Sequence, residues 1–442
     1  MASEADLDAE IKALSILAQH TELYPEFAKL GCVGTLVSLL THENTDIAID
    51  TIGVLGELTD EDVEAEEAQW KSLVDAMLEA DIVDLLTQNL ARLDEKNESD
   101  REGVYHVLSV VENLLSQTDL PEKIGQNSNM LEWLLKRVQE KEVQVGQNKQ
   151  YAAELLAILL QSSRSNRDKV AEMGGVDVTL QLLSVYRRKD PEKDTDEEEY
   201  VENLFDCLTC MVDDEIGKEK FLEAEGVELC QIMLREGKMS KARALRVLDH
   251  ALGGPTGMSA CEKLVETAGL KTIFGMFMKR QEKETVEHLL GIFSSMLRHL
   301  PGQSASRIRT LAKFVEKDYE KIGRLVQLRR EHANRVSRVE REIEAEEKEM
   351  SGEEKEDRAA ESLSRRFDAG LFSLQTLDVI LAWLVAEDDG ARSRIKELMG
   401  KDGKSLEDLK EILQEHLGGM EADEANSESG AREMLQALIA CI

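Results

Sequence analysis

The chain has 442 residues, of which 42% are apolar, 4% are aromatic and only 5 are proline. This composition excludes a disordered chain and favours long helices packed through Leu, Val, Ile and Met. The formal net charge of −35 repels nucleic-acid phosphates and anionic lipid, and it favours basic partners. Residues 1–304 carry most of this charge, with 31 Lys or Arg against 58 Asp or Glu.

Residues 1–30 are expected to form N-terminal capping helices. The stretch "HENTDIAIDTIGVLGELTDED" (42–62) follows them and has an apolar centre between acidic ends. Its residues Ile52, Leu55 and Leu58 belong to a wide apolar face at helical spacing, which is typical of a helix packed on two sides.

The same pattern recurs along residues 31–304. Six stretches combine a small or acidic lead-in with spaced aliphatic residues, and a second apolar helix follows most of them. Their first core residues are separated by 49, 48, 46, 51 and 43 positions and are Val33, Ile82, Met130, Val176, Val227 and Leu270. Because one helix pair cannot bury its apolar face alone, stacked pairs must share a core. We predict an all-α, armadillo- or HEAT-like right-handed helical solenoid, in preference to an irregular all-α domain.

The C-terminal part departs from this period. Residues 305–341 predict one or two long basic helices, since 306–341 hold 11 Lys or Arg against 5 acids. Residues 342–364 predict an acidic linker or solvated helix. Residues 365–442 predict a helical cap of non-repeat helices, with a buried helix at 370–386 that is too short to span a bilayer.

Motifs for catalysis or metal binding are weak. "CLTC" (207–210) has the spacing of a metal or redox site, but it lies in an apolar helix with no second Cys/His pair nearby, so core packing is favoured. "GKDGKS" (400–405) ends like a phosphate-binding loop, but Leu398 replaces its first glycine and no strand precedes it. We predict no enzyme, no metal and no cofactor. The cysteines, with no signal peptide, favour a reduced intracellular protein.

One constellation of acidic residues remains, near the middle or end of each repeat's second apolar helix. In an armadillo array, equivalent helices line one continuous groove, where carboxylates bind an extended Lys/Arg-rich peptide. A solvated acidic surface is the alternative, since one residue in five is acidic. The candidate peptide-binding residues are Glu57, Asp60, Glu112, Asn113, Glu154, Asp206 and Asp249.

Several stretches resemble a known family: "HENTDIAIDTIGVLGELTDED", "YVENLFDCLTC", "ALRVLDHALGGPTG", "GLKTIFGMFMK" and "RRFDAGLFSLQ". Together they resemble the beta-catenin-like, armadillo-type proteins associated with the spliceosome, from about residue 4 to the C-terminus. The resemblance implies an armadillo fold, a nuclear location and no enzymatic activity. It also implies association with the nineteen complex, where the family binds basic, nuclear-localisation-like segments of splicing factors, including the Myb-domain subunit.

Two departures bear on this resemblance. Family members usually begin with a charged extension that carries their import signal, and no such signal is visible here, so it is expected in a missing N-terminal extension. Import adaptors of the same fold grip basic peptides through a Trp and Asn ladder. Here Gly53 and Glu57 take those places, and Asn113 alone fits the ladder. Recognition must then depend on charge and be sensitive to salt.

The leading hypothesis is a non-catalytic scaffold whose acidic groove holds basic tails of spliceosomal proteins. A nuclear transport adaptor for basic cargo is the alternative, and an all-helical enzyme is the third reading. Residues 306–341 are favoured as structural, with contact to RNA, to an acidic partner or to the chain's own groove left open. Direct DNA binding and membrane binding are not expected, and a homodimer is left open.

Overall fold

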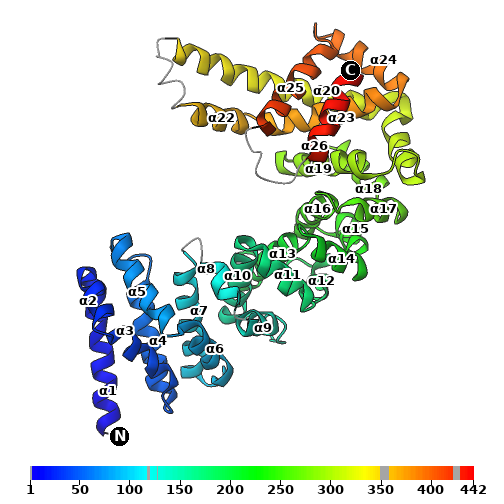
Figure 1. Ribbon diagram of the computed structural model, residues 1–442. Coiled ribbons are helices and arrows are strands. Elements are labelled where there is room, and N and C mark those ends of the chain that lie inside the picture. Colours follow the sequence, from blue (N-terminus) through cyan, green and yellow to red (C-terminus); the bar gives the residue numbers. More distant parts are fainter. Residues whose placement is uncertain (1, 117–119, 127, 349–357, 422–428) are drawn as a thin grey trace. The chain divides into compact units, whose positions relative to one another are not determined.

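The computed structural model describes residues 2–116, 120–126, 128–348, 358–421 and 429–442. Within them every regular element is an α-helix or a short 3-10 helix (Figure 1). The helices divide into two compact units, which are described separately. The first comprises Met1–Leu229 and Gly237–Ser240, and the second comprises Cys230–Glu236 and Lys241–Ile442.

The first unit runs from α1 to the start of α15. Its elements are α1 (Ala2–Ala13), η1 (Leu14–Gln19), η2 (Thr21–Leu23), α2 (Tyr24–Lys29), α3 (Cys32–Ser38), η3 (Leu39–Thr41), α4 (Thr45–Thr59), α5 (Glu67–Glu79), α6 (Ile82–Arg92), α7 (Glu98–Leu115), α8 (Leu120–Gln126), α9 (Ser128–Arg137), α10 (Gln147–Ser162), α11 (Arg164–Glu172), α12 (Gly175–Leu183), η4 (Ser184–Arg187), α13 (Asp196–Met211) and α14 (Glu215–Glu223).

The predicted repeats are present, but each has three helices where the sequence analysis expects two. The triplets of the first unit are α2–α4, α5–α7, α8–α10 and α11–α13, and the predicted pairs are their second and third helices. The first helices of the first unit bury fewer residues than the third helices, and α11 buries only Asn166, Val170 and Ala171. The six core residues predicted from the period are all buried, none more than 6% exposed: Val33, Ile82, Met130, Val176, Val227 and Leu270.

A tight turn joins the first helix of a repeat to its second. In the turns whose residues are all described, one residue has a positive φ between 56° and 84°, and these residues are Gly31, Asp81, Gly174, Glu225 and Ala268. The second helix then starts close against the first, so that a Cβ at Gly226 would lie 2.2 Å from the Phe221 ring. The small or acidic lead-in of the sequence pattern is therefore a turn that sets helix packing.

The third helices of the first unit pack in succession, α4 on α7, α7 on α10 and α10 on α13. Three of them start at a capping side chain, as turn-forming residues there predict: Asn44, Asn97 and Thr195 each accept a bond from a backbone N–H two or three residues ahead. Both flanks of α7 and α10 are consequently buried, and only one stripe of each helix faces solvent.

The second unit starts within α15 (Gly226–Glu236) and contains the remaining repeat helices and the C-terminal part. Its elements are α16 (Met239–Leu252), α17 (Met258–Glu266), α18 (Leu270–Phe277), α19 (Lys283–His299), α20 (Ala305–Glu347), α22 (Ala359–Asp368), α23 (Leu371–Glu387), α24 (Asp389–Gly400), α25 (Leu406–Glu421) and α26 (Ser429–Cys441).

The core of the second unit forms around α20 and α23. Helix α20 is broken at 316–319, where the backbone leaves helical geometry. The basic segment therefore consists of two helices. The predicted buried helix is α23, which contacts α19, α20 and α24 to α26. Its Asp378 is fully buried and accepts two bonds from the Arg329 guanidinium, at 2.6 and 3.0 Å, and the same guanidinium also donates to the Asp408 carbonyl.

Part of the predicted acidic segment 342–364 is helical. Residues 342–347 continue α20 and residues 359–364 belong to α22, whereas 349–357 lie outside the described residues. Across the described ranges, no single helix is long and apolar enough to cross a membrane. Two bent pairs reach that length and composition only together, Thr21–Lys29 with Cys32–Thr41 and Ala359–Asp368 with Leu371–Glu387.

Candidate functional site

Contacts between the third helices fix their register. The Asn113 side chain on α7 donates to the Gly56 carbonyl and the Thr59 hydroxyl of α4, both at 3.2 Å. The Tyr151 hydroxyl on α10 donates to the Glu112 carboxylate on α7. On the far side of α10, the Cys207 thiol of α13 lies 3.8 Å from the Ala153 carbonyl.

Four of the predicted residues lie on these packed third helices, Glu57 on α4, Glu112 on α7, Glu154 on α10 and Asp206 on α13. Glu57 directly follows Gly56, and Glu154 directly follows Ala153; the carbonyls of Gly56 and Ala153 are in contact with the next third helix. Asp206 directly precedes Cys207, whose thiol lies against α10. Glu112 is itself in contact with α10. We call Glu57, Glu112, Glu154 and Asp206 the acidic row, because one lies on each of four successive helices and each is at least partly exposed.

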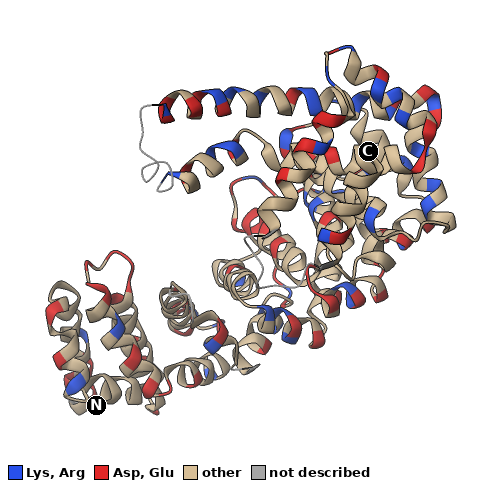
Figure 2. Ribbon diagram, turned by 45° about the horizontal axis from the view of Figure 1, so that its top comes forward, with Lys and Arg blue, Asp and Glu red and all other residues tan. Residues whose placement is uncertain are grey.

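Three carboxylates of the acidic row have no cationic partner among the described residues. Among the described residues no Lys or Arg forms an ion pair with Glu57, Glu112 or Glu154, and Glu112 and Glu154 accept hydrogen bonds only from neutral groups, Tyr151 and Gln150. Burial, followed by the bond to Glu112, raises the pKa of Tyr151 above its ordinary value, so it remains a neutral donor. Figure 2 shows Asp and Glu spread over the helices of the first unit.

Asp60 lies beside the row at the end of α4. It caps that helix, and its carboxylate accepts from the backbone N–H of Asp62 at 2.9 Å. Together with Glu57 it lines an open hollow of about 960 Å³ whose other wall is the N-terminal segment, including Lys12 and Glu22. The structure therefore places Asp60 next to the row, on a surface shared with the N-terminal segment.

Asn113 and Asp249 have other neighbours. The Asn113 amide nitrogen is engaged by α4, so this residue joins two helices, which the ladder analogy does not anticipate. Asp249 lies on α16 in the second unit, where its carboxylate is 3.0 Å from His288 Nδ1 of α19. It is not brought together with the row inside one unit.

A second hollow, of about 1,210 Å³, was missed by the sequence analysis. It lies where α6 and α9 end and α7 and α10 begin, and it includes Tyr105, Trp133 and the acids Glu98, Glu102 and Glu140. Lys96, Arg101 and Lys136 also line it, so its charge is mixed. The Tyr105 ring packs on Tyr151, 5.5 Å between centroids, which connects the hollow to the row at Glu112.

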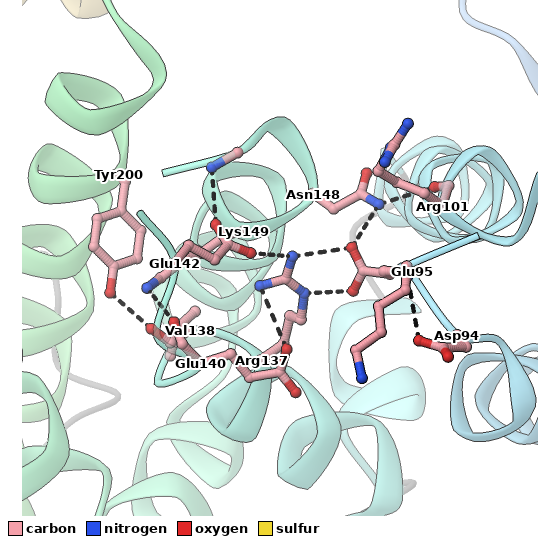
Figure 3. A network of polar contacts seen from close by, with 12 residues as sticks. Asp94, Glu95, Arg101, Arg137, Val138, Glu140, Glu142, Asn148, Lys149 and Tyr200 are labelled. Carbon is pink, nitrogen blue, oxygen red and sulfur yellow. Dashed lines mark hydrogen bonds and ion pairs between the residues drawn. The ribbon is translucent and has the colours of Figure 1, made fainter. Parts of the chain in front are cut away.

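A buried network around Arg137 forms the floor of this hollow (Figure 3). The Arg137 side chain is 6% exposed and donates to both oxygens of Glu95, at 2.6 and 2.9 Å, and to Glu142 at 2.8 Å. Asn148 donates to Glu95 and to the Arg101 carbonyl. The network ties together the two loops that precede α7 and α10, and so positions the helices of the row.

These surfaces carry no metal-binding cluster among the described residues. Where the chain is described, no group of three or more His, Cys, Asp or Glu is placed to hold a metal ion. Cys207 of "CLTC" is fully buried, as core packing predicts, and burial raises the pKa of its thiol well above the ordinary value. A thiol in this state is a poor nucleophile.

Comparison with known proteins identifies the family. The family described as "Catenin-beta-like, Arm-motif containing nuclear" matches residues 1–414. A beta-catenin-like protein 1 homolog from Schizosaccharomyces pombe is 38% identical over 427 residues, which cover 96% of this chain and 74% of that protein. Human beta-catenin-like protein 1 is 39% identical over 431 residues, covering 94% of this chain and 76% of that protein.

Solved structures agree on the fold alone. An engineered protein aligns with a TM-score of 0.57 at 17% identity, over 98% of this chain and 94% of its own. A chain from a structure on the phosphorylation switch between cadherin and beta-catenin aligns with a TM-score of 0.54 at 11% identity, over 98% and 79%. The family match and these identities show that the chain belongs to the catenin-beta-like family of nuclear, armadillo-motif proteins.

Proposed function

We propose that this chain is a non-catalytic scaffold whose acidic row binds Lys/Arg-rich segments of partner proteins. The observation that carries the proposal is the row itself: four carboxylates on four successive packed helices, three of them with no cationic partner among the described residues. A carboxylate left without a cation keeps its full attraction for an incoming ammonium or guanidinium group.

The spacing of the helices fits an extended peptide. Packed helices lie about 8–10 Å apart, and an extended or polyproline-type chain advances about 3.1–3.4 Å per residue. Neighbouring carboxylates of the row therefore match basic side chains about three residues apart. Because no indole lies on α4, α7, α10 or α13, affinity depends on charge and falls steeply with salt.

The cellular setting follows from the family. We propose a nuclear location because the family is described as nuclear. Association with the spliceosome, and with the Myb-domain subunit of the nineteen complex as a source of basic segments, is what the family resemblance implies. Four carboxylates in a row are suited to such segments, since nuclear-localisation-like sequences are runs of Lys and Arg.

The proposal is tested with a labelled peptide that has Lys at every third position, titrated by fluorescence anisotropy. The variant E57Q/E112Q/E154Q/D206N removes four charges but keeps side-chain hydrogen bonding. Since each exposed pair contributes about 0.2–1 kcal/mol, four pairs contribute about 0.8–4 kcal/mol, and the expected loss is about fourfold or more at an ionic strength of about 0.1 M.

The matched control is E43Q/E132Q/E172Q/E219Q, which removes four exposed acids of the same unit outside the third helices. It should change affinity less than about twofold, because general charge is screened beyond ~10 Å. Equal losses in the two variants would show that net charge, and not the row, attracts the peptide.

A further inference from the structure

The second unit contains a surface of the opposite sign. Lys and Arg recur along α20 (Figure 2), and at one place they meet the basic loop that follows α18. The result is an open hollow of about 690 Å³, within the range of about 300–1,000 Å³ usual for ligand sites. We call it the basic hollow; its ionisable lining residues are Lys279, Arg280, Lys283, Glu287, Arg324, Glu331, His332 and Arg335.

Only some of the cations of the basic hollow are paired with acidic side chains of the protein. Glu287 accepts from the Ser373 hydroxyl at 3.0 Å and lies 3.8 Å from Lys283, and Glu331 accepts from Gln327 at 2.9 Å. Lys279, Arg280 and Arg324 have no acidic partner among the described residues. Three cations thus converge without compensation in a chain whose net charge is −35.

The pKa of His332 depends on the electrostatic potential inside the hollow. Its ring is 5% exposed, and Nδ1 lies 3.3 Å from the Gly370 carbonyl, which fixes the neutral ring with Nδ1 as donor. Burial, then the charge of Arg335, lowers the pKa of His332 below its ordinary value. An anion seated in the hollow would oppose the charge of Arg335 and Lys283 and raise that pKa again.

We propose that the basic hollow binds a short acidic peptide segment of a partner protein, apart from the acidic row and independently of it. Arginine and lysine side chains around an apolar floor of Met278, Val286 and Leu328 suit carboxylates carried on a peptide. No Phe, Tyr or Trp is among the lining residues, and the buried His332 ring is held by the Gly370 carbonyl, so the hollow has no exposed aromatic face for bases to stack on. The chain's net charge also opposes the long polyphosphate of RNA more than a few carboxylates.

The experiment uses the full chain, a labelled ten-residue peptide with four Glu, and a single-stranded RNA of equal charge. The double variant K279E/R280E reverses two exposed side chains of the loop and should weaken peptide binding at least tenfold. R324Q, a milder change, should weaken it less. R338E reverses an exposed charge on α20 outside the hollow and should leave affinity within twofold.

Two further readouts decide the proposal. Peptide addition should raise the His332 pKa, followed by its ring resonances in NMR. Equal peptide affinity in K279E/R280E and R338E, no binding by the parent chain, or tighter binding of the RNA would each overturn it. Basic-peptide binding by the acidic row should persist in K279E/R280E, which keeps failure of this proposal separate from failure of the first.

Discussion

The two units differ in how far their charged side chains form ion pairs. In the first unit Glu57, Glu112 and Glu154 contact neutral donors or none, and their charge stays on the surface. In the second unit several cations of α20 pair with acids of the same unit, as in Arg329–Asp378, Arg307–Glu387 and Arg330–Asp402. In the basic hollow, Arg324 of α20 has no acidic partner among the described residues. We therefore expect uncompensated charge, and not total charge, to mark the surfaces offered to partners.

The largest expected effect comes from breaking an internal pair of the second unit. Asp378→Ala leaves the buried Arg329 guanidinium without its carboxylate, and removing one partner of a buried pair costs about 3–5 kcal/mol. Urea unfolding measures the loss. The double variant R329M/D378L should regain most of it, since an apolar pair needs no compensation. A double variant no better than D378A would mean that the two side chains act separately.

A smaller effect is expected where the first unit uses a neutral contact. Asn113→Leu removes two hydrogen bonds between α7 and α4, each of which contributes about 0.5–1.5 kcal/mol to stability. Thermal unfolding should show this loss, while affinity for the basic peptide, measured on folded protein, stays within twofold. Weaker peptide binding with unchanged stability would instead make Asn113 a peptide contact, as the ladder analogy suggests.

The smallest effect is a difference in pH dependence. Because burial lowers the pKa of His332 in the folded state, the unfolded chain binds more protons below its pKa of about 6.5. The stability from neutral His332 is complete above that pH and is lost as pH falls through the folded pKa, at no more than about 1.4 kcal/mol per pH unit.

The variant His332→Gln isolates this term. Burial raises the pKa of Asp378 to about 7, with Arg329 opposing, so Asp378 contributes in the opposite direction over the same range. Subtracting the urea stabilities of the variant from those of the parent at pH 5.5, 6.5 and 7.5 removes the Asp378 contribution. An identical slope in both proteins would contradict a neutral buried His332.

The sequence predicts the repeats because the core residues of each helix lie close together along the chain. Val33, Ile82 and Val176 recur at a nearly constant spacing, and each begins a helix whose own residues carry the apolar pattern. The first helix of each triplet was not predicted. Helix α11 buries few residues and depends on its neighbours for stability, whereas α5 has an apolar pattern at helical spacing, Leu73, Val74 and Met77, that the sequence analysis did not use.

Contacts between distant segments were beyond the sequence analysis. Glu112 could be proposed from its helix position, but its bond to Tyr151 depends on how α7 and α10 pack. The basic hollow joins the loop after α18 to residues of α20 more than forty positions later. The same holds for Arg137, whose two acid partners lie on different loops. Periodicity within one helix carries no information about such pairs.

The most direct test of the central claim is to locate a bound basic peptide. A peptide with Lys at every third position and a photoreactive group at one end is crosslinked to the full chain, and the sites are mapped by mass spectrometry. Crosslinks at one end of the row, on α4 or α13, that move to the other end with the photoreactive group are the predicted result. Crosslinks scattered over the first and second helices of the repeats, or on the second unit, would contradict it.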